Sequence, residues 1–253
     1  MTAPGKLFLV PAPLDFGCAV QSPLRDVLPE ATLVRASQLA HWICENAKTA
    51  LAYLKRIGEL HPLALPLQEL QMTELQREVH KKGDHGGTFD ASPLLAPVLA
   101  GHDVGLLSEA GMPAIADPGS SIARAAHDLG IAVVPLVGPV SLLLALAASG
   151  LNGQNFAFVG YLPQDPAGRA QRIRELEALA LKGGQSQLFI ETPYRNAVLW
   201  QALLQTLQQN TRLAVSSGLT LPHALNRTLP VKAWKHQPPP LVNDTPAVFL
   251  IGR

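Results

Sequence analysis

The sequence predicts an α/β fold made of two α/β domains, the first with a mostly parallel sheet and the second with a mixed sheet. Between residues 104 and 148 the order strand, loop, helix occurs twice in succession, which is typical of parallel strands joined by right-handed crossovers. A second set of apolar runs begins near residue 156, and its last two members are expected to complete an antiparallel or mixed sheet. With 253 residues, 47% of them hydrophobic, the chain is long enough for two domains with cores of their own.

The domain boundary is expected between residues 152 and 153, giving domains 1–152 and 153–253. In the first domain, apolar runs predict strands at 7–10, 31–35, 104–107 and 131–136, and helical spacing predicts helices at 23–28, 45–57, 94–99, 120–129 and 140–148. In the second domain, the same criteria predict strands at 156–161, 187–191, 213–217, 226–231 and 246–251, and helices at 168–181 and 194–208. Glu45 and Asn46 are expected to cap the helix that they begin.

The loop at 108–119 is the first candidate for a small-molecule site. It follows the buried run Val104–Leu107, is rich in glycine and proline, and ends at Gly119 ahead of a helix. Such loops leave backbone N–H groups exposed at the carboxyl edge of a parallel sheet, where ligands bind. The loop at 136–141 is expected to open on the same edge. The alternative is that both loops are ordinary connections.

Charge says little about partners. The formal net charge of +1 is not that of a typical nucleic-acid-binding protein, so only a local cluster could meet RNA. The best such cluster is on the helix predicted at 168–181, and it is formed by Arg169, Arg172, Arg174 and Lys182. The same residues would also fit an ordinary solvated helix face.

Cysteine usage and hydropathy indicate a protein of the cytoplasm. Cys18 and Cys44 are too few for a disulfide framework and lack metal-ligand spacing. The most apolar stretch, residues 131–151, is interrupted by prolines and glycines, and the N-terminus lacks the pattern of a signal peptide. We therefore expect no membrane association.

Residues 72–91 are expected to be the least ordered part of the chain. The segment His80–Gly87 is polar, glycine-rich and carries two histidines. A metal site would need more ligands at defined spacing, so no metal is expected. A mobile loop, a lid over the site and a basic patch for a polyanion are the open alternatives.

Several segments together resemble the tetrapyrrole methylase superfamily, the class III S-adenosylmethionine-dependent methyltransferases. The resemblance is to the branch that methylates a ribose 2′-hydroxyl of small-subunit ribosomal RNA. Its central pattern "SDAGTP-x-I-x-DPG" is matched by Ser108–Gly119, and its "GI-x-VVPLPGP" by Gly130–Pro139. Its "GFLP" is matched by Gly160–Pro163, and its "F-Y-E-S-x-x-R" by Phe189–Arg195. The opening "LYLVPTPIGNL" is only partly kept in Leu7–Phe16.

The resemblance implies two α/β domains with the methyl donor, S-adenosylmethionine, held in a cleft between them, and a homodimer. It also implies donor-binding residues in both domains. These are Leu14, Gly111, Met112, Pro113, Ile115, Gly138, Pro139, Val140 and Ser141 in the first part of the chain, and Glu191, Thr192, Ser217 and Ala247 in the second. An adenine face, ribose hydroxyls and a zwitterionic tail suit apolar contacts and backbone hydrogen bonds.

The sequence also departs from the pattern of that branch. The glycine and asparagine of the first loop are replaced within Leu14–Phe16, and the family's "EDTR" reads Glu45–Lys48. A histidine-rich segment of the family is Leu65–Gln71 here, next to an insertion, and the chain stops at Arg253 without the expected C-terminal extension. We expect these changes to face the acceptor, so the donor side is kept and the acceptor side is altered.

Methyl transfer to an alcohol needs alignment, exclusion of water and a group that accepts the hydroxyl proton. Glu45, Glu109 and Glu191 are the carboxylates available for that role, and the sequence does not choose among them. The leading hypothesis is a methyltransferase acting on a ribose hydroxyl or another acceptor in RNA. A methyltransferase for a small, tetrapyrrole-like molecule and a donor-binding protein without catalysis are the alternatives. A Rossmann dehydrogenase is disfavoured because no G-x-G-x-x-G follows the first strand.

Overall fold

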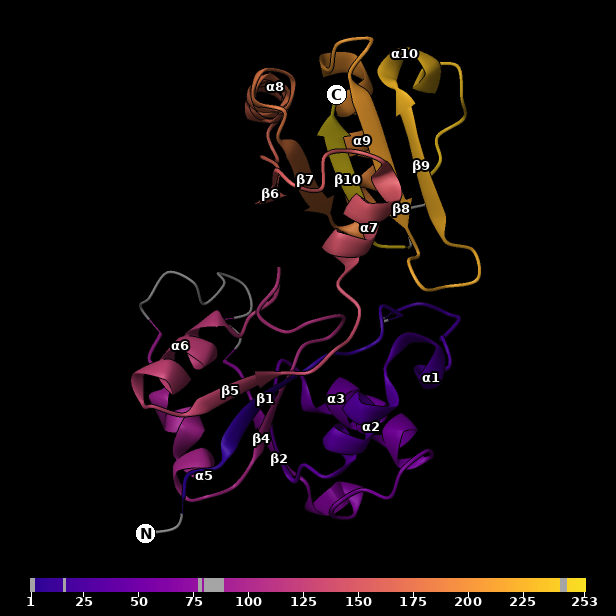
Figure 1. Ribbon diagram of the computed structural model, residues 1–253. Coiled ribbons are helices and arrows are strands. Elements are labelled where there is room, and N and C mark those ends of the chain that lie inside the picture. Colours follow the sequence, from indigo (N-terminus) through magenta and orange to yellow (C-terminus); the bar gives the residue numbers. More distant parts are fainter. Residues whose placement is uncertain (1–2, 16, 77–78, 80–88, 242–244) are drawn as a thin grey trace. The chain divides into compact units, whose positions relative to one another are not determined.

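The computed structural model describes the chain except for residues 1–2, 16, 77–78, 80–88 and 242–244 (Figure 1). The chain divides into two compact units. The first unit holds the chain up to Val140 apart from Gly17–Gln21, and the second holds Gly17–Gln21 and the chain from Ser141 onward. The boundary expected between residues 152 and 153 lies after the helix that begins at Ser141, and it stays a prediction.

The sheet of the first unit has five parallel strands in the order β3-β2-β4-β1-β5. The strands are β1 Lys6–Val10, β2 His41–Cys44, β3 Gln71–Glu74, β4 Val104–Leu107 and β5 Ala132–Pro135. The predicted parallel sheet is therefore confirmed. β4 is fully buried, as its apolar run predicts, and β1 lies between β4 and β5.

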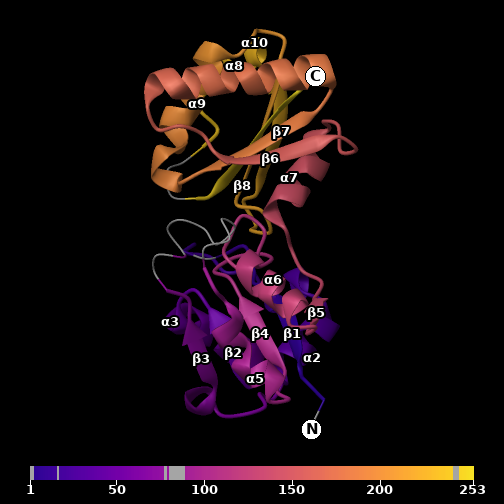
Figure 2. The same cartoon turned by 90° about the vertical axis from the view of Figure 1, so that its left-hand side faces the viewer.

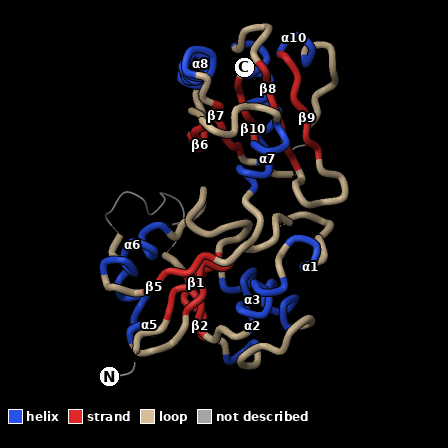
Figure 3. The backbone as a smooth tube through the Cα atoms, in the orientation of Figure 1, coloured by secondary structure: helices blue, strands red, loops and turns tan. Residues whose placement is uncertain are grey.

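Helices cover both faces of this sheet (Figures 1 and 3). One core cluster joins β1 and β2 to α1 (Leu24–Val27), α2 (Glu30–Ser37) and α3 (Ala47–Gly58). The other joins β1 and β4 to η2 (Ser92–Leu95), α5 (Ala96–Leu99) and α6 (Ser120–Asp128). A short 3₁₀ helix, η1, spans Leu67–Glu69.

Two strands of the first unit lie where the sequence pattern does not place them. The strand predicted at 31–35 is wrong, because these residues lie in helix α2, where Thr32, Leu33, Ala36 and Ser37 are buried at helical spacing. The true strand is β2. The edge strand β3 was not predicted, since its mostly exposed residues show no apolar run. β5 is also an edge strand and is half-exposed, whereas a buried strand was predicted.

The second unit contains a mixed five-stranded sheet in the order β6-β7-β10-β8-β9, which confirms the predicted sheet type. β6 and β7 are parallel, and the remaining neighbours are antiparallel. The strands are β6 Phe156–Tyr161, β7 Ser186–Glu191, β8 Arg212–Ser217, β9 Leu225–Pro230 and β10 Ala247–Gly252.

Its helices are α7 Ser141–Ser149, α8 Pro166–Gly183, η3 Pro193–Arg195, α9 Asn196–Thr206 and α10 Val231–Trp234. α8, α9 and α10 share a core with β7, β8 and β10, and Figure 2 shows α8 extended along the sheet. α7 contacts β8, β9 and β10, and it buries Leu142, Ala145 and Leu146. None of the helices in the described ranges is long and apolar enough to cross a membrane.

Candidate functional site

The carboxyl edge of the parallel sheet contains a point where neighbouring connections diverge. The chain leaves β2 toward the edge strand β3, whereas it leaves β4 in the opposite direction, toward β5 beyond β1. Ligands bind at such switch points in open α/β sheets. The residues that follow β1, β2, β4 and β5 at this edge are therefore the candidates for a ligand-binding or catalytic site.

Three of the predicted site residues meet there, although they lie far apart in the sequence. Ala12 and Gly111 exchange two backbone hydrogen bonds, of 2.9 and 3.0 Å, which join the loop after β1 to the loop after β4. A Cβ atom on Gly111 would lie 3.1 Å from Leu14 Cδ2 and 3.4 Å from the carbonyl oxygen of Pro139. Gly111 also has φ +72°, a conformation that favours glycine. The loops after β1, β4 and β5 thus converge on one glycine.

The central loop is held in a strained conformation. Ala114 and Ala116 have φ of 66° and 65°, which L-residues with a Cβ rarely adopt. Gly119 closes the loop at φ 137°, where an added Cβ would lie 3.0 Å from Leu106 Cδ2. Strain of this kind gathers at functional sites and persists only where the surroundings impose it. Of the other predicted residues of the loop, Pro113 is buried, Met112 is half-buried and Ile115 is 42% exposed.

The loop after β5 is fixed against the loop after β1. A Cβ on Gly138 would lie 2.3 Å from Pro11 Cγ, so only glycine allows this approach. The hydroxyl of Thr32 donates a 2.7 Å hydrogen bond to the carbonyl oxygen of Val137 and anchors the same loop to α2. Val140 and Ser141 follow and are half-buried.

Carboxylates gather where β2 and β4 end. Cys44 and Leu107 are neighbours in the sheet, so Glu45 and Ser108 follow them side by side. The backbone N–H of Glu109 donates to Glu45 Oε1 at 3.4 Å, and Thr49 donates its hydroxyl to Glu109 Oε1 at 2.7 Å. Two predicted candidates, Glu45 and Glu109, are thus brought together.

Asp117 joins this group, and the sequence analysis did not name it as a candidate. Burial, together with the charges of Glu45 and Glu109, raises the pKa of its carboxyl to about 7, and the nearby Ser108 hydroxyl opposes this rise. The same environment raises the pKa of the buried Cys44 thiol to about 12, through burial and the charges of Glu74, Glu109 and Glu45. Asp117 belongs to the matched "DPG" pattern, which was the signal that could have found it.

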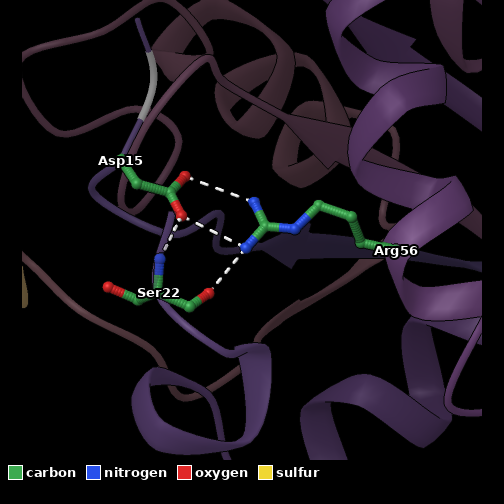
Figure 4. A network of polar contacts seen from close by, with 3 residues as sticks. All are labelled: Asp15, Ser22 and Arg56. Carbon is green, nitrogen blue, oxygen red and sulfur yellow. Dashed lines mark hydrogen bonds and ion pairs between the residues drawn. The ribbon is translucent and has the colours of Figure 1, made fainter. Parts of the chain in front are cut away.

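Two departures from the family pattern have structural roles. Asp15 is buried and accepts from Arg56 Nη1 at 3.3 Å, from Arg56 Nη2 at 3.1 Å and from the backbone N–H of Ser22 at 3.0 Å (Figure 4). Arg56 Nη2 also donates to the carbonyl oxygen of Ser22 at 2.7 Å. Asp15 therefore fixes the loop after β1 to α3.

Asn46 caps α3, as predicted. Its Oδ1 accepts the backbone N–H groups of Lys48 and Thr49 at 2.9 and 3.3 Å. The aspartate of the family pattern could serve the same purpose, because both side chains are strong N-caps. For this residue, the change from the family pattern leaves the local structure intact.

The predicted residues of the second unit form a row across its sheet. Ala247 of β10 is paired with Glu191 of β7 on one side and with Ser217 of β8 on the other. Thr192 follows Glu191 directly. The hydroxyl of Ser217 donates to the carbonyl oxygen of Pro246 at 3.0 Å. Four residues from three distant segments are therefore neighbours.

Glu191 is already fully partnered within this row. Its residue exposure is 5%, Oε1 accepts from the backbone N–H and hydroxyl of Thr192 at 2.8 and 3.2 Å, and Oε2 lies 2.6 Å from Arg195 Nη2. The ion pair raises the pKa of Arg195. A carboxylate held in this way is suited to fixing Arg195 and poorly suited to accepting a proton.

The basic cluster of α8 is only partly as predicted. Arg174 and Lys182 are exposed and Arg172 pairs with Glu175, but Arg169 is 8% exposed, so placing it on the outer side of the helix was wrong. It lies on the same helix face as the buried Ile173 and Leu176, one turn further toward the N-terminus.

No group of three or more His, Cys, Asp or Glu that could hold a metal occurs among the described residues. The segment His80–Gly87, for which a lid or a basic patch was considered, lies outside the described residues. Cys18 and Cys44 are not joined by a disulfide bond, and Cys44 is buried.

Comparisons with known proteins agree with this architecture. The sequence model of the Tetrapyrrole (Corrin/Porphyrin) Methylases matches residues 24–232. A ribosomal RNA small subunit methyltransferase I of Pseudomonas aeruginosa is 31% identical over 191 residues, which are 76% of this chain and 58% of the relative. The protein of the same name from Escherichia coli O157:H7 is 27% identical over 216 residues, 85% of this chain and 66% of the relative. The chain thus spans about three fifths of the length of these curated relatives.

Two solved structures share the fold. A methyltransferase, CobJ, has a TM-score of 0.57 at 15% identity, and a uroporphyrin-III-C-methyltransferase from Thermus thermophilus has a TM-score of 0.50 at 19% identity. Each alignment covers 98% of this chain and 94% of the other. The family match extends over most of the chain and includes the loops after β4 and β5, the carboxylates Glu45, Glu109 and Asp117, and Glu191 and Ser217 of the second sheet. The chain belongs to the tetrapyrrole (corrin/porphyrin) methylase family.

Proposed function

We propose that the protein is an S-adenosylmethionine-dependent methyltransferase that methylates a ribose hydroxyl in RNA. One observation carries the proposal: in a chain of this family, three loops converge on Gly111 at the carboxyl edge of a parallel sheet. The curated relatives named ribosomal RNA small subunit methyltransferase I support RNA as the acceptor. The near-neutral net charge makes a small, tetrapyrrole-like acceptor the alternative.

The residues at the convergence suit the donor. Leu14 and Pro139 supply an apolar wall and a carbonyl oxygen around the space that a side chain on Gly111 would fill. Small-molecule sites combine such apolar surfaces with a few backbone hydrogen-bonding groups. We assign donor binding to all of the residues named for it from the sequence, including the row formed by Glu191, Thr192, Ser217 and Ala247. When bound, S-adenosylmethionine supplies a methyl group activated by a sulfonium.

The chain itself must align the acceptor, exclude water and accept the hydroxyl proton. We assign the last task to Asp117, because a general base works best when its pKa lies near the working pH. Its carboxylate lies close enough to Glu45 and Glu109 for their charges to raise its proton affinity. Glu191 would act by holding Arg195 in place. Neither role depends on a metal.

We also propose a homodimer located in the cytoplasm. The resemblance to the family supports the dimer, and two cysteines that form no disulfide fit a reducing compartment. Light scattering on the purified chain would measure the mass of the assembly, and fractionation of cells would locate it. A monomer in solution would contradict the dimer without affecting the proposed reaction.

Titration calorimetry with S-adenosylmethionine, followed by transfer of a tritiated methyl group to RNA from cells that lack the protein, tests the reaction. We expect donor binding and label in a small-subunit ribosomal RNA. No binding at millimolar donor would contradict every methyltransferase version. Label in a tetrapyrrole fraction alone would establish the small-molecule alternative, and donor binding without any transfer would indicate a protein that has lost catalysis.

A further inference from the structure

The carboxyl ends of β6 and β7 bring two exposed tyrosines to one edge of the second sheet. The strands are parallel, and Tyr161, the last residue of β6, is paired with Ile190 of β7. Tyr194 lies in η3, just after β7 ends at Glu191. Tyr161 is 57% exposed and Tyr194 is 70% exposed. The third tyrosine of the chain, Tyr53, is buried and donates its hydroxyl to the carbonyl oxygen of Pro11, so it serves the core.

Arg195 lies beside both tyrosines, and one side of its guanidinium is fixed. Nη2 is 2.6 Å from Glu191 Oε2, and the other oxygen of Glu191 is held by Thr192. Tyr194 directly precedes Arg195, Tyr161 is paired with Ile190 beside Glu191, and both tyrosines act electrostatically on Arg195, so the three residues share one edge of the sheet. In the described part of the chain, Nε and Nη1 of Arg195 have no hydrogen-bond partner, and the side chain is 19% exposed.

Such an arrangement suits a nucleotide. Exposed aromatic rings stack on unpaired bases, and every base offers a π face. A guanidinium presents several N–H donors in a fixed plane, which match the oxygens of a phosphate. The ion pair with Glu191 holds this plane in place before any ligand arrives, so little freedom is lost on binding.

We propose that Tyr161, Tyr194 and Arg195 bind one unpaired nucleotide of the acceptor RNA, with its base on the tyrosine rings and its phosphodiester oxygen on the free side of Arg195. The inference rests on the proposed function, since it assigns a subsite to the RNA. Tyr194 occupies a position that the family pattern leaves open.

The test uses the full chain and a short single-stranded RNA that contains one 2-aminopurine, whose fluorescence falls when it stacks. We expect binding with quenching, and at least a tenfold weaker affinity for the double variant Tyr161→Ala, Tyr194→Ala, since each stacked base contributes about 1–3 kcal/mol. Tyr161→Phe and Tyr194→Phe should keep the affinity, because the rings remain. The dependence of affinity on salt should keep its slope, because no charge is removed.

Phe156→Ala is the matched control. It removes an exposed aromatic ring, 41% accessible, from the other end of the same strand, and should leave RNA affinity unchanged. Donor affinity by calorimetry and thermal melting should be the same in all of these variants. Arg195 is left intact, because its removal would leave the buried carboxylate of Glu191 without its cation.

Equal RNA affinity of the wild type and the double tyrosine variant would overturn the inference, as would equal weakening by Phe156→Ala. Wild-type protein that binds the donor but no RNA would also overturn it. The inference would likewise be overturned if the double tyrosine variant lost affinity for a tetrapyrrole and not for RNA. In each of these cases donor binding persists, so the proposed methyltransferase stands. Absence of donor binding in the wild type contradicts the proposed function instead.

Discussion

Two carboxylates, the half-buried Asp117 in the first unit and the buried Glu191 in the second, have opposite electrostatic surroundings. Glu191 has both oxygens occupied by donors from Thr192 and Arg195. Asp117 shares its surroundings with Glu45 and Glu109, and its pKa is raised to about 7. Burial and nearby negative charges therefore raise the pKa of Asp117, whereas hydrogen-bond donors and a cation occupy the oxygens of Glu191. In the proposed function, Asp117 accepts the proton of the acceptor and Glu191 positions Arg195.

The largest effect is expected from filling the convergence of loops that lies beside the acidic group. Gly111→Trp should weaken S-adenosylmethionine binding at least a hundredfold, because the indole would occupy the space beside Leu14 and Pro139 that we assign to the donor. Gly130→Trp is the matched control. Gly130 has φ +69°, close to the +72° of Gly111, but nothing lies within 4 Å of an added Cβ. Both variants carry a similar backbone strain of about 1 kcal/mol. Equal donor affinity in the two, measured by calorimetry, would mean that the site lies elsewhere.

Asp117→Asn tests the proposed role of Asp117 as the general base. It should lower the rate of methyl transfer at least a hundredfold, a typical contribution of a general base, with donor affinity unchanged. In the wild type, kcat/KM should rise as the pH increases through about 7, since the base must be ionised. An unchanged pH profile in the variant would show that another group accepts the proton.

The same variant should also change how the free energy of unfolding depends on pH. Because the folded-state pKa of Asp117 is raised above its unfolded value, ionisation favours the unfolded chain. The free energy of unfolding of the wild type should therefore fall as the pH rises from about 4 through 7. Asp117→Asn should reduce this fall by roughly 1–3 kcal/mol, as measured by urea unfolding at pH 5 and pH 8.

Glu191→Gln tests the proposed role of Glu191 in holding Arg195 in place. It removes the charge that holds Arg195, and breaking a buried ion pair costs about 3 kcal/mol, or somewhat less here because Arg195 is 19% exposed. Urea unfolding measures the loss. Glu175→Gln breaks the exposed pair with Arg172 and should leave stability unchanged. If Glu191→Gln left stability intact and abolished a pH-dependent step instead, the roles of the two acids would have to be exchanged.

The smallest effect is expected at the start of α3, next to Glu45. Asn46→Ala should cost about 1 kcal/mol of stability through loss of the cap, whereas Asn46→Asp should keep it. Thermal melting compares the three proteins. If Asn46→Asp instead changed the rate of methyl transfer at constant stability, this position would belong to the acceptor site.

Much of the fold could be predicted because buried strands and helix ends leave local patterns of apolar and capping residues in the sequence. The strands at 104–107 and 156–161 have the predicted bounds, since each is an unbroken run of apolar or small residues. α3 begins at Ala47, directly after the predicted cap residue Asn46. The α2 segment misled because leucine and valine within a short run also suit a strand, and only the burial of residues one helical turn apart distinguishes the two.

The sequence by itself determined which segments are apolar, where the loops carry glycines and which family pattern the loops follow, because these depend on neighbouring residues. Only the tertiary structure decided which of them meet. Gly111 lies against Leu14 and Pro139, the pKa of Asp117 is raised by burial and by the charges of Glu45 and Glu109, and Arg195 lies at the same sheet edge as Tyr161. These groups are brought together by the order of the strands in each sheet, and pKa values depend on charges that are near in space and distant in the chain.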